Sequence, residues 1–378
     1  MEKLRICYLI TSFEKGGAER FLCDLSEELL SRNDVEFIIG VLYHNDQYEN
    51  MTKGLPIRQL NYKVFSLFGK NECKGYQKLL EEFRPHIIHT HRYLAEFLSS
   101  YYVTDQYKYV CHGHDNMVQL KRLSFNNIFS KTHILNYLEK RFLIKMKYKM
   151  VKTYFIANSR HTEEYYNNIL PSSCKSEVRL IQYGFNYSKF NNKHRKSLRK
   201  GEKLKLINVG SFQAKKNQKF IVEIAEKLKS NKIEFEILLL GDGLLKKAVE
   251  QEVAEHNLSG CIKFHGNVQD VEKYMRDSHI YLHTAYYEPF GLVFLEAMAS
   301  GLPCVTLDGK GNRDLIEQDK NGYLFFQQDA SLFSKAIIEL YKDSSKYEQM
   351  SEYCKLFASS YDIKLKTEEL VEFYKSIV

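Results

Sequence analysis

The chain has 378 residues, of which 44% are hydrophobic and 13% aromatic, and it carries a net charge of +8. This apolar share excludes wholesale disorder, and the length fits two domains better than one. The moderate positive charge suits an anionic partner, which leaves phosphorylated ligands, lipid head groups and nucleic acid open, and it equally fits an ordinary basic surface.

The eight cysteines are scattered along the chain and none stands in a C-x-x-C pair. This pattern indicates free thiols in a reducing compartment and argues against a disulfide framework or a zinc site. The apolar run at the N-terminus is too short for a signal peptide, and no later stretch reaches the length of a membrane span. We therefore expect a soluble protein on the cytoplasmic side.

The first half of the chain alternates strand-like and helix-like segments. "LRICYLI" predicts a strand, "TSFEKGGAER" a glycine loop and "FLCDLSEELLS" a helix. Further strands are predicted in "VEFIIGVLY", "HIIHTH", "YKYVCHGHDN" and "KTYFIANS", the last followed by a serine-capped helix. Such alternation predicts a largely parallel sheet covered on both faces.

The second half restarts the same pattern after a polar, basic segment at 191–203, which we interpret as a linker or exposed loop. Strands are predicted in "LKLINVGSF", "FEILLLGDG", "IKFHGNV", "HIYLHTAYY" and "PCVTLDGKG", and the tail from about 331 to 378 is expected to be mostly helical. Ligands of open α/β sheets bind outside the carboxyl ends of the strands, so a cleft between two such domains is the expected site.

The stretch "YYEPFGLVFLEAMASGLP" places Glu288 and Glu296 on either side of an almost wholly apolar run. We predict a helix that starts near Gly291 and ends at Gly301. Its first backbone N–H groups would form an anion site suited to a diphosphate, and the two carboxylates would accept hydrogen bonds from flanking sugar hydroxyls. The alternative is a core helix whose glutamates pair with cations elsewhere in the chain.

Two other loops follow predicted strands. In "NVGSFQAKKNQ" a strand ends at Gly210, and Lys215 or Lys216 lies before the next helix, where an ammonium group can neutralise phosphate charge. "LLLGDGLLKKAVE" has G-x-G at a strand end but lacks the third glycine of a dinucleotide fingerprint. We interpret it as a tight turn between strand and helix.

Four histidines stand near the ends of two predicted strands: His89 and His91 in "HTH", and His112 and His114 in "CHGHD". We expect the two side chains of each pair to point apart, and no Asp-x-Asp pair occurs that could hold a divalent ion. We therefore predict no metal site. His112, followed by a glycine at a strand end, is the best candidate for a substrate contact.

The segment "LEKRFLIKMKYKMVK" at 138–152 mixes six basic residues with apolar ones. A basic amphipathic helix of this kind can lie on an anionic membrane surface. The alternative is an ordinary surface helix whose apolar stripe faces the core. The basic residues include Arg141, Lys145, Lys147, Lys149 and Lys152.

Nearly end to end, the chain resembles the retaining glycosyltransferases of family 4, which have the two-domain GT-B fold. The most specific match is "EPFGLVFLE", the family's E-x7-E motif, followed by "AMASGLPCV". "GGAER" matches the N-terminal glycine loop, and "HGNVQD", "DGKGNRDLI" and "NGYLF" match later segments. "IQYGFNYSKF" resembles the segment at the domain junction, with Tyr183 and Asn186 at positions where the family usually has Asn and Asp.

The resemblance implies an α/β protein of two Rossmann-like domains that face each other across a deep cleft. It implies an acceptor-binding domain over 1–185, a nucleotide-sugar-binding domain over 186–355, and a C-terminal helix over 356–378 that packs back towards the first domain. It also implies a nucleoside diphosphate sugar as donor, with no cofactor, no required metal and no nucleic acid.

Family roles carried over to this sequence give the C-terminal domain most of the donor contacts. Glu296 is expected to hold the ribose hydroxyls, and Glu288 a hydroxyl of the donor sugar. The diphosphate is expected at Lys216 and at the segment around the helix start. This segment comprises Phe290, Gly291, Leu292 and Val293.

Three further groups complete the implied site. Gly16 and Gly17 are expected close to the phosphates, and the base near Asn267 and Val268. His112 is expected to line the donor sugar and the acceptor.

One position departs from the family pattern: Ser211 stands where the family usually has Arg after the glycine of "VG". The diphosphate thus lacks a bidentate partner that lysine does not replace geometrically. We expect Lys216 to act with Lys215 or Arg313 instead.

The implied reaction transfers a sugar to an acceptor hydroxyl with retention of the anomeric configuration. A cytoplasmic enzyme with a basic segment at 138–152 suits a lipid-linked glycan at the inner face of the plasma membrane, as in capsule, lipopolysaccharide or exopolysaccharide assembly. The alternatives are a nucleotide-sugar epimerase of the same fold and a non-catalytic protein that binds nucleotide sugar. A nicotinamide dehydrogenase is disfavoured because both glycine loops lack the fingerprint.

Overall fold

The computed structural model describes residues 2–62, 73–120, 130–191, 197–199 and 201–378. The chain forms two compact units, one of Met1–Gly184 with Ile363–Val378 and the other of Phe185–Asp362. The chain therefore passes between the units after Gly184 and again after Asp362. The sequence predicted these changes at 185/186 and 355/356, and the second crossing comes later because a helix of the second unit continues to Ser359.

The first unit is built on a seven-stranded parallel sheet in the order β3-β2-β1-β4-β5-β6-β7. The strands are β1 (Leu4–Ile10), β2 (Val35–Val41), β3 (Ile57–Gln59), β4 (Ile87–His91), β5 (Lys108–Gly113), β6 (Thr153–Ala157) and β7 (Ser176–Leu180). Central strands such as β4 and β6 are buried along their whole length, as a parallel sheet covered on both faces requires.

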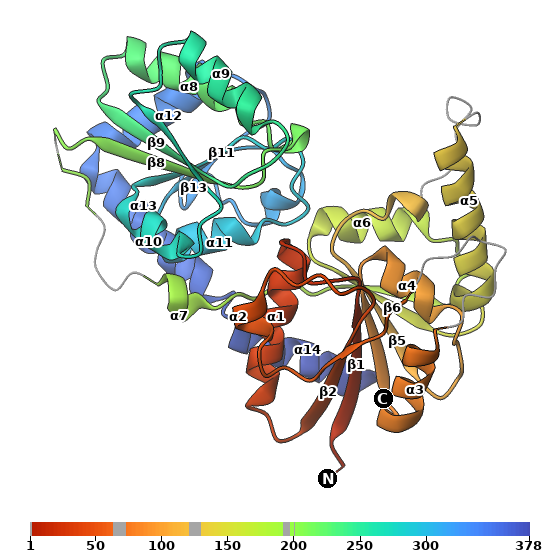
Figure 1. Cartoon of the computed structure of the whole chain (residues 1–378). Coiled ribbons are helices and arrows are strands. Elements are labelled where there is room, and N and C mark those ends of the chain that lie inside the picture. Colours follow the sequence, from red (N-terminus) through yellow and green to blue (C-terminus); the bar gives the residue numbers. More distant parts are fainter. Residues whose placement is uncertain (1, 63–72, 121–129, 192–196, 200) are drawn as a thin grey trace. The chain divides into compact units, whose positions relative to one another are not determined.

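The helices of this unit cover the sheet, and the last one comes from the C-terminal end of the chain (Figure 1). They are α1 (Gly17–Leu30), α2 (Glu49–Thr52), α3 (Lys74–Phe83), α4 (Tyr93–Ser99), α5 (Lys131–Leu143), α6 (Arg160–Ile169) and α14 (Ile363–Ile377). Helix α14 packs beside α1, where Arg32 pairs with Glu368, and its buried Tyr374 hydroxyl lies 3.3 Å from the hydroxyl of Tyr8. The sequence predicted that the C-terminal helix returns to the first domain.

The second unit has a six-stranded parallel sheet in the order β10-β9-β8-β11-β12-β13 (Figure 1). The strands are β8 (Leu204–Val209), β9 (Phe235–Leu240), β10 (Ile262–Gly266), β11 (Ile280–His283), β12 (Cys304–Leu307) and β13 (Gly322–Phe325). The helices are α7 (Tyr187–Phe190), α8 (Lys219–Ser230), α9 (Lys246–Glu255), α10 (Val271–Asp277), α11 (Leu292–Ala299), α12 (Ala330–Lys342) and α13 (Ser344–Ser359).

Both sheets reverse their strand order at one place, between β1 and β4 in the first unit and between β8 and β11 in the second. This is the doubly wound arrangement, in which the loops after the two central strands diverge and leave room for a ligand at the carboxyl edge. The two-unit α/β architecture predicted from the sequence is confirmed.

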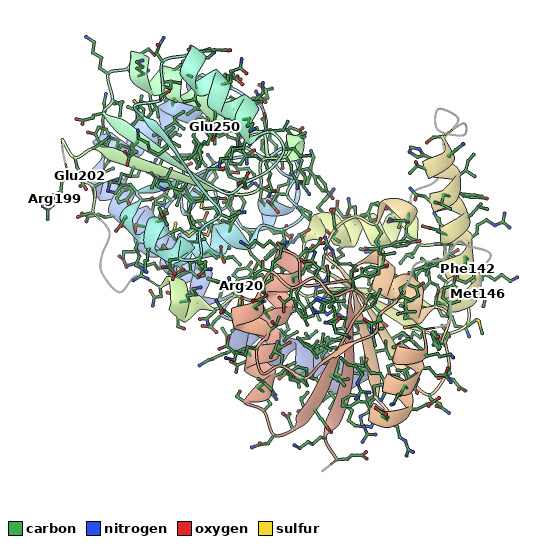
Figure 2. All side chains as sticks on the ribbon, viewed as in Figure 1. Arg20, Phe142, Met146, Arg199, Glu202 and Glu250 are labelled. Carbon is green, nitrogen blue, oxygen red and sulfur yellow. The ribbon has the colours of Figure 1, made fainter. Side chains whose placement is uncertain are left out.

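Residues 138–152 do not form the single amphipathic helix that the sequence predicted. Helix α5 ends at Leu143, and a π-helix follows over Ile144–Tyr148. Phe142 and Met146 lie on either side of this junction (Figure 2), and Phe142 packs against the core of the unit. Lys147 is fully buried, so one of the five predicted surface cations instead belongs to the interior.

The physical reason for the buried lysine is a buried acid. The Nζ atom of Lys147 donates to Glu96 Oε2 at 2.8 Å and to Ser99 Oγ at 2.7 Å. Both side chains of the ion pair are 0% exposed, and a buried carboxylate needs such a partner. Lys147 lies in the π-helical turn, and its ammonium group contacts Glu96 and Ser99 of α4.

The sequence also led to expectations about the cysteine thiols and about membrane-spanning segments. All eight cysteines are free, as predicted, and six of them are buried. Among the described residues, no helix combines the length and the apolar character needed to cross a membrane. The loop predicted over 191–203 lies partly outside the described residues.

Candidate functional site

Two loops of the second unit meet at its switch point, one after β8 and the other after β11. The Thr284 hydroxyl donates to the backbone oxygen of Lys216 at 3.0 Å, and the Tyr286 amide donates to the backbone oxygen of Lys215 at 3.2 Å. These bonds hold the lysine loop against the segment that leads to Glu288. Sequence reasoning selected both loops separately, and the fold brings them together.

The centre of this site is a buried ion pair between Lys216 and Glu288. The Nζ atom of Lys216 donates to Glu288 Oε2 at 2.5 Å, and the side chains are 17% and 12% exposed. Burial alone would raise the pKa of Glu288, but the charge and hydrogen bond of Lys216, together with the charge of Lys215, outweigh it and hold this pKa below its ordinary value. Glu288 is therefore an anion at neutral pH.

His283 is the neighbour that sequence reasoning missed. Its Nε2 atom lies 3.6 Å from Glu288 Oε2, and its Nδ1 atom lies 2.8 Å from the hydroxyl of Tyr281. Burial, with Lys216 nearby, lowers the pKa of His283 to about 3, so the ring is neutral at pH 7. The available signal was its place as the last residue of β11, where side chains reach the carboxyl edge.

Glycines of the loop after β12 fix the backbone of Glu288. The Glu288 amide donates to Gly309 O at 2.7 Å, and the Gly311 amide donates to Glu288 O at 3.0 Å. A Cβ atom at Gly311 would lie 1.8 Å from the backbone oxygen of Pro289, so no larger residue fits without moving this segment. The position of the carboxylate thus depends on a close backbone approach.

Helix α11 begins directly after this segment. Gly291 stands at its N-cap with φ 99°, in the left-handed region, and the helix runs over Leu292–Ala299, inside the predicted bounds. Phe290 and Leu292 are buried, whereas Val293 and Glu296 are half-buried. The Phe294 amide donates to Gly291 O at 3.0 Å, which leaves the amides of Leu292 and Val293 at the helix start, and the helix dipole makes them suited to an anion.

Arg313 and Ser211, the other residues considered for the diphosphate, have partners of their own. The Arg313 guanidinium binds Asp308 in a bidentate manner, with N···O distances of 2.8 and 2.6 Å. Although burial raises it, the pKa of Asp308 is brought down to about 2 by this pair, so the charge of Arg313 is already offset. Ser211 is half-buried, and its backbone oxygen accepts from Gln218 Nε2 at 3.0 Å. Lys215 is the better candidate to assist Lys216.

Asn267 and Val268, expected near the base, follow β10 at the outer end of the strand order. Asn267 is exposed and Val268 half-buried. The loop is tied to its neighbour by the Gly241 amide, which donates to Gly266 O at 2.7 Å. The fold therefore places this pair two strands away from β8, on the same carboxyl edge as Lys216.

Gly16, Gly17 and His112 belong to the first unit. Gly16 precedes α1, and a Cβ atom there would lie 2.3 Å from Glu19 Oε2, a carboxylate that pairs with Arg92 at 2.6 Å. Gly17 is exposed at the first position of the helix. His112 lies in β5, almost completely buried, with its ring 5.4 Å from that of Phe21.

The prediction that the histidine pairs point apart was wrong. Residues two positions apart on a strand share a face, and the rings of His89 and His91 lie 4.4 Å apart. His112 and His114 are likewise 4.4 Å apart and stacked. The four rings gather at the carboxyl ends of β4 and β5, next to the switch point of the first sheet.

Comparison with known families covers most of the chain. Residues 15–188 match Glycosyltransferase Family 4, and residues 189–357 match Glycosyl transferases group 1.

Two curated relatives and one solved structure show the range of similarity. The chain is 28% identical over 172 residues, 46% of its length, to N-acetyl-alpha-D-glucosaminyl L-malate synthase of Bacillus anthracis. It is 26% identical over 183 residues, also 46% of its length, to the amylovoran biosynthesis glycosyltransferase AmsK of Erwinia amylovora. The chain spans less than half the length of these relatives, 44% of each. Alr3699/HepE of Anabaena, solved with UDP and glucose, shares the fold with a TM-score of 0.77 at 20% identity, covering 99% of this chain and 100% of that one.

Proposed function

The chain belongs to family 4 of the glycosyltransferases, and on this premise we propose that it transfers a sugar from a nucleoside diphosphate sugar to a hydroxyl group of a glycan acceptor. The observation that carries the proposal is the group formed by Lys216, Glu288 and the start of α11 at the switch point of the second unit. A cation, an anion-binding helix end and a carboxylate are the three elements that a diphosphate sugar requires.

The proposed chemistry depends on where negative charge develops during the transfer of the sugar. As the glycosidic bond to the donor breaks, negative charge grows on the diphosphate, and the amides of α11 with Lys216 would stabilise it. Glu288 cannot bind phosphate, but it accepts hydrogen bonds from a sugar hydroxyl. Because an ammonium group has three donors, Lys216 is able to keep Glu288 in place and bind the phosphate as well.

The finer points of the reaction belong to the same proposal. Retention of the anomeric configuration is expected, with a donor phosphate oxygen helping to deprotonate the acceptor hydroxyl. Stabilisation of the leaving group by Lys216 and the helix start supports transfer without a required metal. UDP is the favoured nucleotide, because the similar fold of Alr3699/HepE was solved with UDP and glucose, and GDP is the second choice.

The proposed acceptor is a lipid-linked glycan of capsule, lipopolysaccharide or exopolysaccharide assembly. The similarity to a glycosyltransferase of amylovoran biosynthesis supports this class of product. We also propose that the enzyme acts in the cytoplasm, at the inner face of the plasma membrane, because this location suits a lipid-linked acceptor.

We propose that α5 and the segment after it contact that membrane. Lys147 takes no part in this contact, because its side chain is buried. Helix α5 exposes apolar side chains between its cations, with Ile134, Leu135 and Leu138 each about two-fifths exposed (40%, 46% and 39%). Lys145 and Lys149 are exposed as well. Flotation with vesicles of anionic phospholipid should carry the protein upward, and Leu135→Ser with Leu138→Ser should abolish this. Equal flotation of both proteins would refute the contact.

Calorimetric titration with UDP, GDP, ADP, CMP and NAD, with and without magnesium, tests the donor site. One nucleoside diphosphate is expected to bind, independently of magnesium, and Glu296→Ala should lose this binding. Glu250→Ala, which removes a glutamate from α9 of the same unit, is the matched control and should bind as the wild type does. A preference for NAD, or no binding at all, would overturn the proposal.

Product analysis separates transfer from the epimerase alternative. Incubated with the nucleotide sugar alone, a transferase gives slow hydrolysis, whereas an epimerase interconverts the free nucleotide sugars. Interconversion at a rate unaffected by glycan acceptors would favour the epimerase.

A further inference from the structure

Three buried histidines of the first unit direct nitrogen atoms towards one another. His91 pairs in register with His112 on the neighbouring parallel strand, and His89 lies on the same face of β4 as His91. One ring nitrogen of each residue lies within 4.8 Å of those of the other two. The three side chains are at most 1% exposed.

The free nitrogens of these rings are exceptional for a protein interior. Within the described part of the chain, no hydrogen-bond partner exists for Nε2 of His89, Nε2 of His91 or either nitrogen of His112. A buried polar atom without a partner costs about 1–3 kcal/mol, and native proteins contain few of them. A ligand that accepts from or binds these rings would satisfy four such atoms in one cluster.

The opposite nitrogens of two of the rings are held in place. His89 Nδ1 bonds to the hydroxyl of Tyr374, and His91 Nδ1 bonds to His114 Nε2 at 2.8 Å. His114 in turn bonds through Nδ1 to the hydroxyl of Tyr183. When Nδ1 of His89 and of His91 carries the proton, each Nε2 presents its lone pair to the cluster. This is the arrangement in which outer partners orient the imidazole ligands of a metal ion.

From this geometry we propose that His89, His91 and His112 bind one divalent transition-metal ion. Neutral imidazole is a good ligand for Zn²⁺, Co²⁺, Ni²⁺ and Cu²⁺ and a poor one for Mg²⁺ and Ca²⁺, so the site selects the former group. Burial keeps the rings neutral at pH 7, as metal binding requires.

The geometry needs only a small adjustment. Two nitrogens at about 2.1 Å from one tetrahedral zinc ion are about 3.4 Å apart, so the rings have to approach by roughly 1 Å. Side-chain rotation on the adjacent strands supplies this. His112 has two nitrogens without a partner, so one serves the ion and the other stays available for the substrate contact implied by the family resemblance.

The role we assign to the ion is to tie the sheet to the last helix. Tyr374 lies on α14, which the chain reaches only after completing the second unit, and its bond to His89 joins that helix to β4. An ion held by His89, His91 and His112 would fix β4, β5 and α14 together. The proposed donor site involves Lys216 and Glu288 of the second unit, so the two proposals stand or fall separately.

The test is metal binding by the full chain after treatment with a chelator and dialysis. Calorimetric titration with Zn²⁺ should give one ion per chain, and Co²⁺ should give the visible absorption of a nitrogen-ligated site. His89→Ala and His91→Gln should both lose this binding. His256→Ala is the control, because His256 lies on the surface of the second unit beside Glu226, where zinc could bind adventitiously.

A second variant covers the case in which a histidine substitution prevents folding. Tyr374→Phe keeps the ring and removes only the hydroxyl that orients His89, and loss of such a partner weakens metal binding about 10- to 100-fold. Circular dichroism checks that each variant is folded. Absence of binding by the wild type, unchanged affinity in Tyr374→Phe, or loss of binding in His256→Ala alone would overturn the proposal.

Discussion

Glu288 is a buried carboxylate whose charge depends mainly on one lysine. Burial favours its neutral form, and Lys216 at 2.5 Å reverses that preference. Because the folded-state pKa lies below the ordinary value of 4.5, the pair stabilises the protein above that pH and loses this effect as the pH falls through the folded value.

Lys216→Met should therefore destabilise the protein most at neutral pH. Removing one partner of a buried ion pair typically costs about 3–5 kcal/mol, because the remaining charge is left without compensation. In the variant, burial would raise the pKa of Glu288 above its ordinary value, so acidification should relieve the cost. Urea unfolding at pH 7 and pH 4.5 measures the difference from the wild type, which should shrink at the lower pH.

Lys215→Met is the control for this prediction. In the described part of the chain the Lys215 side chain donates no hydrogen bond to Glu288, and its Nζ atom lies 6.0 Å from the centre of the Tyr287 ring. It should change the unfolding free energy by less than about 1 kcal/mol, as partly exposed charges usually do. A Lys216→Met deficit that is equal at both pH values would show that the pair does not govern the charge of Glu288.

Gly311→Ala tests the backbone approach that positions the same carboxylate. The added Cβ atom would lie 1.8 Å from Pro289 O and 2.7 Å from Glu288 O, so the segment before α11 must move. We expect nucleotide affinity to fall at least about tenfold, because a displacement of about 1 Å in a site can cost that much or more. Gly260→Ala, where a Cβ atom meets nothing within 4 Å, should bind nucleotide normally. Equal affinities, measured by calorimetry, would contradict the assignment.

The sequence predicted the individual residues of this site better than their partners. Glu288, Lys216 and the start of α11 were identified because a charged residue or glycine in a strand-end loop is unusual locally. The contact between Lys216 and Glu288, and the third member His283, depend on the adjacency of β8 and β11, which are separated in sequence by β9 and β10. Strand order is a property of the whole sheet, and one sequence does not display it directly.

At the scale of elements, the segment from α5 to the π-helix shows how a charge pattern can mislead. Lysines spaced among apolar residues predict a surface helix, and Lys145 and Lys149 are indeed exposed. Lys147 between them is buried against Glu96 and lies 4.9 Å from the Tyr109 ring. The buried acid that requires it is on another helix, so the local pattern carries no sign of it.

Lys147→Met should destabilise the first unit by about 3–5 kcal/mol, because Glu96 would be left buried without its cation. Glu96→Gln in the same chain should recover part of this loss, since a neutral amide costs less to bury. Lys149→Met is the control and should leave stability unchanged within about 0.5 kcal/mol. Thermal unfolding is compared for the wild type, Lys147→Met, Glu96→Gln, the double variant and Lys149→Met. Additive effects in the double variant would show that the two side chains do not interact.

Strands were predicted well in the middle of each sheet, whereas three of the four edge strands were missed. The predicted segments correspond to ten strands, and those left out are β3, β7 and β13, all at an edge of a sheet. Strand β3 has only three residues, and β7 has no buried residue. An edge strand is half-solvated, so it lacks the continuous apolar run that marks the buried strands.

At the scale of the whole molecule, the first unit is completed by the last segment of the chain. Helix α14 buries Ile363, Leu370, Val371 and Tyr374 in that unit, and Lys375 pairs with Asp34 at 2.7 Å. The second unit, Phe185–Asp362, is continuous in sequence. Loss of the C-terminal helix should therefore affect one unit only.

A chain that ends at Asp362 separates the two stabilities. Without α14, the first unit exposes the apolar residues that this helix covers, and its unfolding midpoint should fall, because burial of each large apolar side chain contributes about 1.5–3 kcal/mol. UDP, which we propose binds at Lys216 and Glu296, should raise the midpoint of the second unit alone, by about 2.7 kcal/mol of stability at 100 times the dissociation constant. Scanning calorimetry of both chains with and without UDP should thus show two transitions, one lowered by truncation and the other raised by the nucleotide. A nucleotide effect on the truncation-sensitive transition would mean that UDP binds the first unit, and the assignment of the donor to the second unit would be wrong.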